Sequence, residues 1–491
     1  MLTCSLSTIE RKDIHGYYCK AKRKKNGSMK YIIAVVLIAA IGGSLFGYDQ
    51  GVVSGALSFF SVHFKMTQAE IGFVSGVLAL GAMLGCLIAG WMSDHAGRKP
   101  VMITAGALFT LSSLLLALSP SVSYLVAGRI LSGIAIGMAS TIVPLYISEV
   151  APARIRGTLV SANQLAFAIG MTTVYIVNAL IANLNISSWN IQFGWRFMFG
   201  SGVVPAIIFF VLTPFIPESP RFLFKRGKSD KALKILTRMN GEATAEEESK
   251  AIQDQLHHEN KGLIRELFKP GVRFALLIAL LAAAFQQLTG TIAVGYYAPI
   301  IFQKTGIGTN ASLIETIGIG VVKIIFVAIF MVYIDKLGRK KLLTWGAFLM
   351  AAALLALALI FSVGKFNMLM NILIMVGVLA HTAFYELSWG GGAWVIISEV
   401  FPTSIRGRAQ SLSSLTMFLA SYFVSQGFPM MLNGIGATWT FVIFAGFCLI
   451  MMWFAARVLP ETNGKTLEQI QSDFTHKNAK QVTVTKEGVT K

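Results

Sequence analysis

The sequence predicts an all-α integral membrane protein of twelve transmembrane helices, built as two related six-helix bundles. Three observations predict this class: the composition, the long apolar runs, and a set of motifs that occurs twice. Of the 491 residues, 55% are hydrophobic and 13% are charged, whereas an ordinary soluble domain has roughly 25% charged residues. The apolar residues come in runs long enough for a helix to cross ~30 Å of hydrocarbon.

The apolar runs define the predicted spans. They lie near residues 32–55, 71–92, 100–119, 123–148, 157–182, 195–215, 274–301, 312–334, 342–363, 368–398, 408–432 and 437–458. An even number of spans puts both termini on one side of the membrane. Most Lys and Arg residues fall in the two tails and alternate loops, while the opposite loops hold Lys65, Lys304 and Lys365, with Arg196 at the mouth of span six. Because cytoplasmic loops are enriched in Lys and Arg, we expect a multi-pass protein of the cell membrane with both termini cytoplasmic.

The net charge of +19 does not indicate binding to nucleic acid, because the basic residues are spread over many loops and do not form one face. Residues 1–30 are predicted to be a basic tail, and its run Lys22–Lys25 is expected to lie against anionic membrane lipid. Met29 is an alternative start. His15, His257 and His258 do not have metal-ligand spacing, so we expect neither a metal nor another cofactor.

Three motifs occur twice in the same order at similar offsets. Asp94-His-Ala-Gly-Arg-Lys99 recurs as Asp335-Lys-Leu-Gly-Arg-Lys340, and Pro217-Glu-Ser219 recurs as Pro460-Glu-Thr462. Between them, a Ser-Glu pair followed by Ile-Arg-Gly occurs at 148–157 and again at 398–407. The repeat predicts two related halves.

The predicted organisation has five parts: a tail at 1–30, a six-helix bundle at 31–215, a cytoplasmic linker at 216–273, a second bundle at 274–461, and a tail at 462–491. In the linker, Ser229-Asp230 is predicted to cap one short amphipathic helix and Thr244 a second. These helices are expected to brace the two halves.

The repeated charges fall at the cytoplasmic ends of spans and form a candidate gate. Its members are Asp94, Arg98, Glu149, Arg156, Asp335, Arg339, Glu399 and Arg406. Glutamates and arginines so placed can pair between helices when that end is closed. The alternative is that the basic residues only fix topology. Two halves joined by a charged latch suit rocking about a central site, which is the alternating-access scheme.

Residues 30–470 resemble the sugar porter family of the major facilitator superfamily. The resemblance rests on the repeated motifs together with Gly47-Tyr-Asp-Gln-Gly-Val52, Gly128-Arg129, Pro217-Glu-Ser-Pro-Arg221 and Gln286-Gln-Leu-Thr-Gly290. Bacterial proton symporters for xylose, arabinose and galactose look most similar. The resemblance implies the major facilitator fold and a monomeric symporter, not an enzyme, that imports a monosaccharide with protons as the coupling ion.

Asp49 in span one and Arg129 in span four are candidates for proton coupling. Charges at membrane depth are costly, so they normally pair, face a cavity and mark an ion path. The resemblance implies this role for Asp49, because proton-coupled members carry an acid there. A purely structural ion pair is the alternative.

The candidate sugar site lies between the halves, where amides and aromatic rings are expected to bind the hydroxyls and C–H faces of a sugar. Its predicted members are Phe46, Gln164, Gln286, Gln287, Tyr296, Lys323, Gly390 and Trp394. For an intramembrane glutamine, the alternative is an interhelical hydrogen bond.

The chain departs from the family pattern at several of these positions. Ile292 stands where the family has an asparagine, and Met417-Phe418 replaces an amide followed by tryptophan. Lys323 replaces another asparagine, and Glu386 adds a further charge in span ten.

Three readings of Lys323 stay open: it pairs with Glu386, it binds an acidic substrate, or it takes part in proton coupling. The alternative functions are therefore a proton symporter for a sugar acid or polyol, and an uncoupled sugar facilitator. A sugar-sensing receptor is disfavoured by the short, non-periodic C-terminal tail.

Overall fold

The computed structural model describes residues 28–152, 155–258, 267–269, 272–364, 366–401, 403–459 and 461. These residues form helices and turns and no strand. Within them, twelve helical segments are long and apolar enough to cross a membrane, from Met29–His63 to Gly436–Arg457. The predicted all-α membrane class is therefore confirmed.

The first bundle contains spans one to six. Its single-helix spans are α2 (Met29–His63), α3 (Gln68–Ala96), α4 (Arg98–Ala117), α5 (Val122–Val150) and α6 (Arg156–Asn183); the sixth span combines α7 (Ser187–Trp189), the π-helical turn η1 (Asn190–Gly194), α8 (Trp195–Ser201), α9 (Val203–Leu212) and the 3-10 turn η2 (Thr213–Phe215). Glycines let these helices approach closely, as is common inside membranes. A Cβ added to Gly81 or Gly85 of α3 would lie 2.3 or 2.2 Å from a backbone oxygen of α5.

The second bundle contains spans seven to twelve. Its elements are α13 (Arg273–Leu288), α14 (Thr291–Gln303), α15 (Thr309–Leu337), α16 (Arg339–Val363), α17 (Met368–Tyr385), the π-helical turn η4 (Glu386–Gly390), α18 (Gly391–Glu399), α19 (Thr403–Gly434) and α20 (Gly436–Arg457). Span seven breaks at Gly290, which has a φ of +80° that a residue with a Cβ rarely adopts. Span ten changes to a π-helical turn at η4. Both interruptions fall beside candidate site residues.

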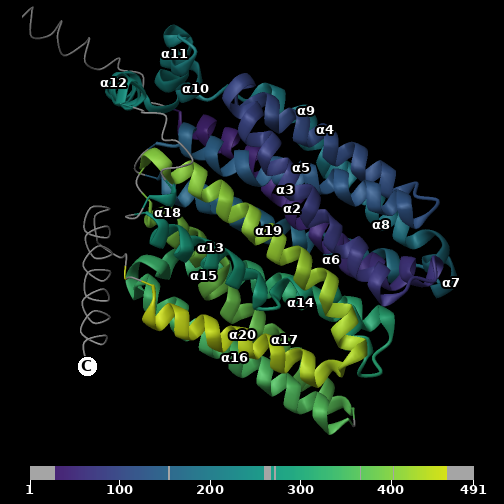
Figure 1. Ribbon diagram of the computed structural model, residues 1–491. Coiled ribbons are helices and arrows are strands. Elements are labelled where there is room, and N and C mark those ends of the chain that lie inside the picture. Colours follow the sequence, from purple (N-terminus) through teal and green to yellow (C-terminus); the bar gives the residue numbers. More distant parts are fainter. Residues whose placement is uncertain are drawn as a thin grey trace, which may run out of the picture.

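Short helices follow the first bundle and lie together at one end of the molecule (Figure 1). They are α10 (Pro220–Lys225), α11 (Ser229–Asn240) and α12 (Glu242–His258). We call this the linker end and the opposite one the far end. The predicted caps are wrong: the N-cap of α11 is Lys228, without a side-chain hydrogen bond, and α12 starts before Thr244. Gly241, at φ +84°, ends α11 and lets the next helix begin at once.

The two halves meet along three helix pairs: α3 with α19, α6 with α15, and α2 with α14. A Cβ on Gly72, near the start of α3, would lie 2.3 Å from the backbone oxygen of Gln426. Gln303 of α14 donates to Ser58 of α2 at 3.1 Å. Because α2 begins at the linker end, its last turns and the first turns of α3 lie at the far end. The contacts of Ser58, near the end of α2, and of Gly72 therefore lie toward the far end. At the linker end, Gly157 and Gly407 face open space.

Candidate functional site

The two candidate coupling charges lie in contact inside the first bundle. Asp49 on α2 is 8% exposed and Arg129 on α5 is 0% exposed. The Arg129 Nη1 donates to Asp49 Oδ2 at 3.0 Å, and the Ser132 hydroxyl donates to Asp49 Oδ1 at 2.8 Å. Each carboxylate oxygen therefore has its own donor, which offsets the cost of burying the charge.

Ser132 was not named from the sequence, although a signal for it exists. It follows Arg129 by three positions on one helix, so both side chains lie on the same face. Tyr296 of α14, in the other half, is also buried and lies near both Asp49 and Arg129. The Nε and Nη2 atoms of Arg129 are buried with no partner among the residues that the structure describes.

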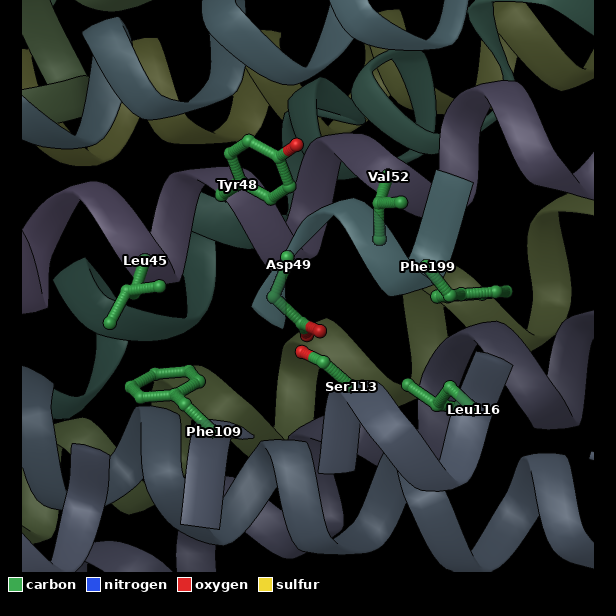
Figure 2. Close-up of a pocket in the computed structure, with 9 residues that line it drawn as sticks. Leu45, Tyr48, Asp49, Val52, Phe109, Ser113, Leu116 and Phe199 are labelled. Carbon is green, nitrogen blue, oxygen red and sulfur yellow. The ribbon is translucent and has the colours of Figure 1, made fainter. Parts of the chain in front are cut away.

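A small cavity lies beside Asp49, between α2, α4 and the sixth span. It has room for about one water molecule, and it is lined by Leu45, Tyr48, Asp49, Val52, Phe109, Ser113, Leu116, Phe199 and Gly202. Figure 2 shows the Asp49 carboxylate pointing toward the Ser113 hydroxyl. Apart from Asp49, none of the lining residues was predicted as a site residue, although Tyr48 and Val52 belong to the motif Gly47–Val52.

The candidate amides of span seven differ in their surroundings. Gln286 is buried, and its Nε2 donates to the backbone oxygens of Gly390 at 2.8 Å and Trp389 at 3.2 Å. In this conformation Gln286 therefore makes interhelical hydrogen bonds, the alternative considered above. Gln287 is half-buried, and within the described part of the chain its Nε2 donates only to the Gln286 Oε1, at 3.4 Å.

Three other candidates are half-buried: Phe46, Gln164 and Trp394. The Phe46 ring packs edge-on against Phe167, with ring centroids 5.0 Å apart. Gln164 and Trp394 make no hydrogen bond to another residue in the described part of the chain, so their polar groups remain free for a ligand. Of the remaining predicted contacts, Gly390 ends η4 and Tyr296 is buried beside the coupling pair.

The Lys323 ammonium forms an ion pair with the Glu386 carboxylate, which joins α15 to η4. The two side chains are 6% and 2% exposed. The sequence left this pairing open, and the structure confirms it. The second carboxylate oxygen, Oε2, has no partner in the described part of the chain. The centroid of the Tyr385 ring lies 5.8 Å from the Lys323 Nζ, and His381 is buried in the same span as Glu386.

The candidate gate residues form pairs within each half. Arg98 binds Glu149 at 2.8 Å in the first bundle, and Arg339 binds Glu399 at 3.1 Å in the second. Asp94 lies 3.6 Å from Lys225 at an exposed position, and the Arg156 side chain is exposed. The side chains of Asp335 and Arg406 fall outside the described ones. In this conformation the recorded gate pairs thus join neighbouring helices of one half.

The repeated Pro-Glu motif has a role that the sequence analysis did not assign. Glu218 accepts the backbone N–H of Arg98 at 3.0 Å, and Glu461 accepts that of Arg339 at 3.1 Å. A carboxylate at a helix N-terminus satisfies free N–H groups and complements the helix dipole. The signal was present in the repeat, because both acidic residues recur with the Asp-x-x-Gly-Arg-Lys motif that begins the capped helix.

The geometry offers a buried ion pair in one half, polar groups on α6 and α18 that remain free for a ligand, and contacts between the halves toward one end. Within the described residues, no group of three or more His, Cys, Asp or Glu side chains could hold a metal ion. The arrangement suits reversible binding and conformational change.

Comparisons with known proteins agree with this geometry. The family described as sugar (and other) transporter matches residues 35–474. The arabinose-proton symporter of Bacillus subtilis is 39% identical, over 91% of this chain and 96% of its own. The D-xylose-proton symporter of Escherichia coli is 35% identical, over 90% and 95%. A structure of the proton:xylose symporter XylE bound to 6-bromo-6-deoxy-D-glucose superimposes with a TM-score of 0.78 at 34% identity, over 91% and 99%. The chain therefore belongs to the sugar transporter family of the major facilitator superfamily and is a membrane transporter, not an enzyme.

Proposed function

We propose that this protein is a proton-coupled symporter that imports a neutral monosaccharide by alternating access. The observation that carries the proposal is the buried Asp49–Arg129 pair with Tyr296 of the other half beside it. An acid in this position can carry the proton, and its surroundings extend to the interface along which the halves move.

The coupling follows from the charges. When Asp49 is ionised, the Arg129 guanidinium holds it through the 3.0 Å ion pair. Protonation removes the negative charge and weakens that hold, so Arg129 gains freedom to change its contacts. Because Tyr296 is on α14 in the second half, a change at the pair alters the contact between the two halves. Protonation thereby favours one conformation over the other.

The linker end is the cytoplasmic side in this proposal, with both termini cytoplasmic and the protein in the cell membrane. The excess of Lys and Arg in the loops at that end supports this orientation. The structure then corresponds to an inward-facing conformation, since the recorded contacts between halves lie toward the far end. The chain carries both halves of the transport unit, so a monomer suffices, with its basic residues against lipid.

The substrate class follows from the residues between the halves. Gln164 and Trp394 offer free polar groups, Gln287 offers the carbonyl oxygen of its amide, and Trp394 adds an aromatic face, as a sugar requires. Glu386 neutralises Lys323, so this lysine does not offer the free positive charge that a sugar acid would need. The relatives named for arabinose and xylose support a neutral monosaccharide. The pairs Arg98–Glu149 and Arg339–Glu399 then act as parts of the cytoplasmic gate.

Uptake into proteoliposomes with an imposed proton gradient tests the proposal. Labelled xylose, arabinose, glucose and glucuronate are offered with and without a protonophore. We expect a neutral sugar to accumulate and the protonophore to abolish accumulation. The Asp49→Asn variant should lose accumulation but keep sugar exchange across the membrane at equal pH. Uptake that ignores the protonophore would show a facilitator, and preference for glucuronate would show a carrier of sugar acids.

A further inference from the structure

The cavity beside Asp49 lies wholly within the first half. Its lining residues come from α2, α4 and the sixth span, and apart from Asp49 none of them belongs to the candidate coupling or sugar sites. The sugar candidates Gln287, Lys323 and Trp394 lie in the second half, and the first-half candidates Phe46 and Gln164 do not line the cavity. One carboxylate thus faces a space that is separate from the interface where the sugar binds.

The cavity has polar groups that a water molecule needs. Asp49 points toward the Ser113 hydroxyl (Figure 2), and that hydroxyl has no hydrogen-bond partner among the described residues. The neighbouring Tyr48 hydroxyl is already occupied by Ser201 at 2.8 Å. A buried water needs two to four polar partners and about one probe sphere of volume. Asp49 and Ser113 meet the first condition, and the size of the cavity meets the second.

The absence of a side chain at Gly202 keeps this space open. A Cβ added there would lie 3.0 Å from the Ser113 Oγ and 3.7 Å from the Tyr48 ring. Such a distance is tighter than ordinary van der Waals contact, so an alanine would push into the cavity. By contrast, a Cβ on the nearby Gly200 would touch only the Ala117 Cβ, at 3.4 Å.

The other approach to the carboxylate is unsuitable for a proton carrier. Arg129 covers Oδ2 with a positive charge, which repels an incoming cation in a medium of low dielectric constant. Ser132 donates its proton to Oδ1. The cavity is the face of Asp49 that neither of these two donors covers.

We propose that the cavity holds a water molecule, bound to Asp49 and Ser113, that carries the coupling proton to and from Asp49. This proposal rests on the proposed symport. In the transfer, an O–H bond of a hydronium ion in the cavity breaks, an O–H bond forms on the Asp49 carboxylate, and neutral water remains. The proton therefore moves within the first half while the sugar binds between the halves, and a bound sugar does not block the proton.

Variants that fill the cavity test this route. Ser113→Val and Gly202→Ala occupy the space, and Ser113→Ala removes the hydroxyl but leaves the space. Gly200→Ala, near the end of α8 in the same span as Gly202, is the matched control. Two rates are measured in proteoliposomes: proton-driven accumulation of xylose, and xylose exchange at equal pH. Monodisperse elution in detergent shows that each variant is folded.

We expect both filling variants to slow accumulation by about tenfold or more, as loss of a positioned proton-transfer group does, while exchange stays within about twofold. Ser113→Ala should slow accumulation to a degree between that of the filling variants and that of the wild type, because it leaves the space but removes one of the two polar partners of the water. Gly200→Ala should leave accumulation unchanged. In an Asp49→Asn background, filling the cavity should have no further effect on exchange.

Wild-type accumulation rates in both filling variants would overturn the water route. An equal loss of accumulation and exchange in folded protein would overturn it too, because the cavity would then matter only for packing. Failure of the symport proposal looks different: the wild-type protein itself would exchange xylose without accumulating it.

Discussion

The buried Lys323–Glu386 pair provides the sharpest test of the energetics. We consider Lys323→Met and Glu386→Gln, alone and together. Each single variant leaves one charge buried without its partner, because the remaining side chain is almost inaccessible, at 6% or 2% exposure. Breaking a buried ion pair in this way costs about 3–5 kcal/mol, whereas replacing both partners by neutral groups is often nearly neutral.

We therefore expect each single variant to lower the free energy of unfolding by about 3–5 kcal/mol and the double variant to lower it by about 1 kcal/mol or less. The measurement is unfolding in mixed detergent micelles, followed by circular dichroism. Glu315→Gln is the matched control, because Glu315 is a half-buried carboxylate on α15, the helix of Lys323, and its Oε2 has no partner among the residues that the structure describes. It removes a charge without touching the pair.

A double variant as unstable as the sum of the single variants would refute the reasoning, because the two charges would then act independently. Transport gives a second readout. Glu386→Gln leaves Lys323 with an uncompensated positive charge, so glucuronate should compete better with xylose than it does in the wild-type protein. Unchanged competition in a folded variant would mean that the lysine charge does not reach the substrate.

Three further predictions concern packing, capping and closure. Gly72→Val should obstruct the packing of the two halves at the far end at a cost of about 1–3 kcal/mol and should slow uptake. Gly90→Ala on the same helix, where a Cβ meets nothing within 4 Å, should transport normally. Equal uptake rates of the two variants would contradict the role of Gly72 in far-end closure. Glu218→Ala should lower the free energy of unfolding by about 0.5–2 kcal/mol, because α4 loses its cap. Glu246→Ala, at an exposed position, should leave the free energy of unfolding unchanged, and thermal unfolding measures both variants. Tyr175→Phe removes a hydrogen bond between the halves, to the Gly295 oxygen at 3.2 Å. It should shift the conformational equilibrium away from far-end closure by about 0.5–1.5 kcal/mol, which cysteine labelling near the far end can measure. Unaltered labelling would show that this bond does not stabilise far-end closure.

The sequence by itself determined the fold class, the spans and the two-fold repeat. Hydropathy and loop charge are properties of short segments, so twelve spans could be predicted without knowing how the helices pack. The pairing of Asp49 with Arg129 was also within reach, because a charge at membrane depth normally needs a partner.

The tertiary structure decided which partner each buried polar group takes. A partner depends on helix rotation, on crossing depth and on the breaks at Gly290 and η4, and a linear pattern encodes none of these. The Gln286 amide therefore donates to the backbone of η4, Lys323 is neutralised by Glu386, and Arg98 and Arg339 each bind a glutamate of their own half. The water-sized space at Asp49 likewise forms where residues of α2 and α4 meet the turn at Gly202, although these segments are far apart in the sequence.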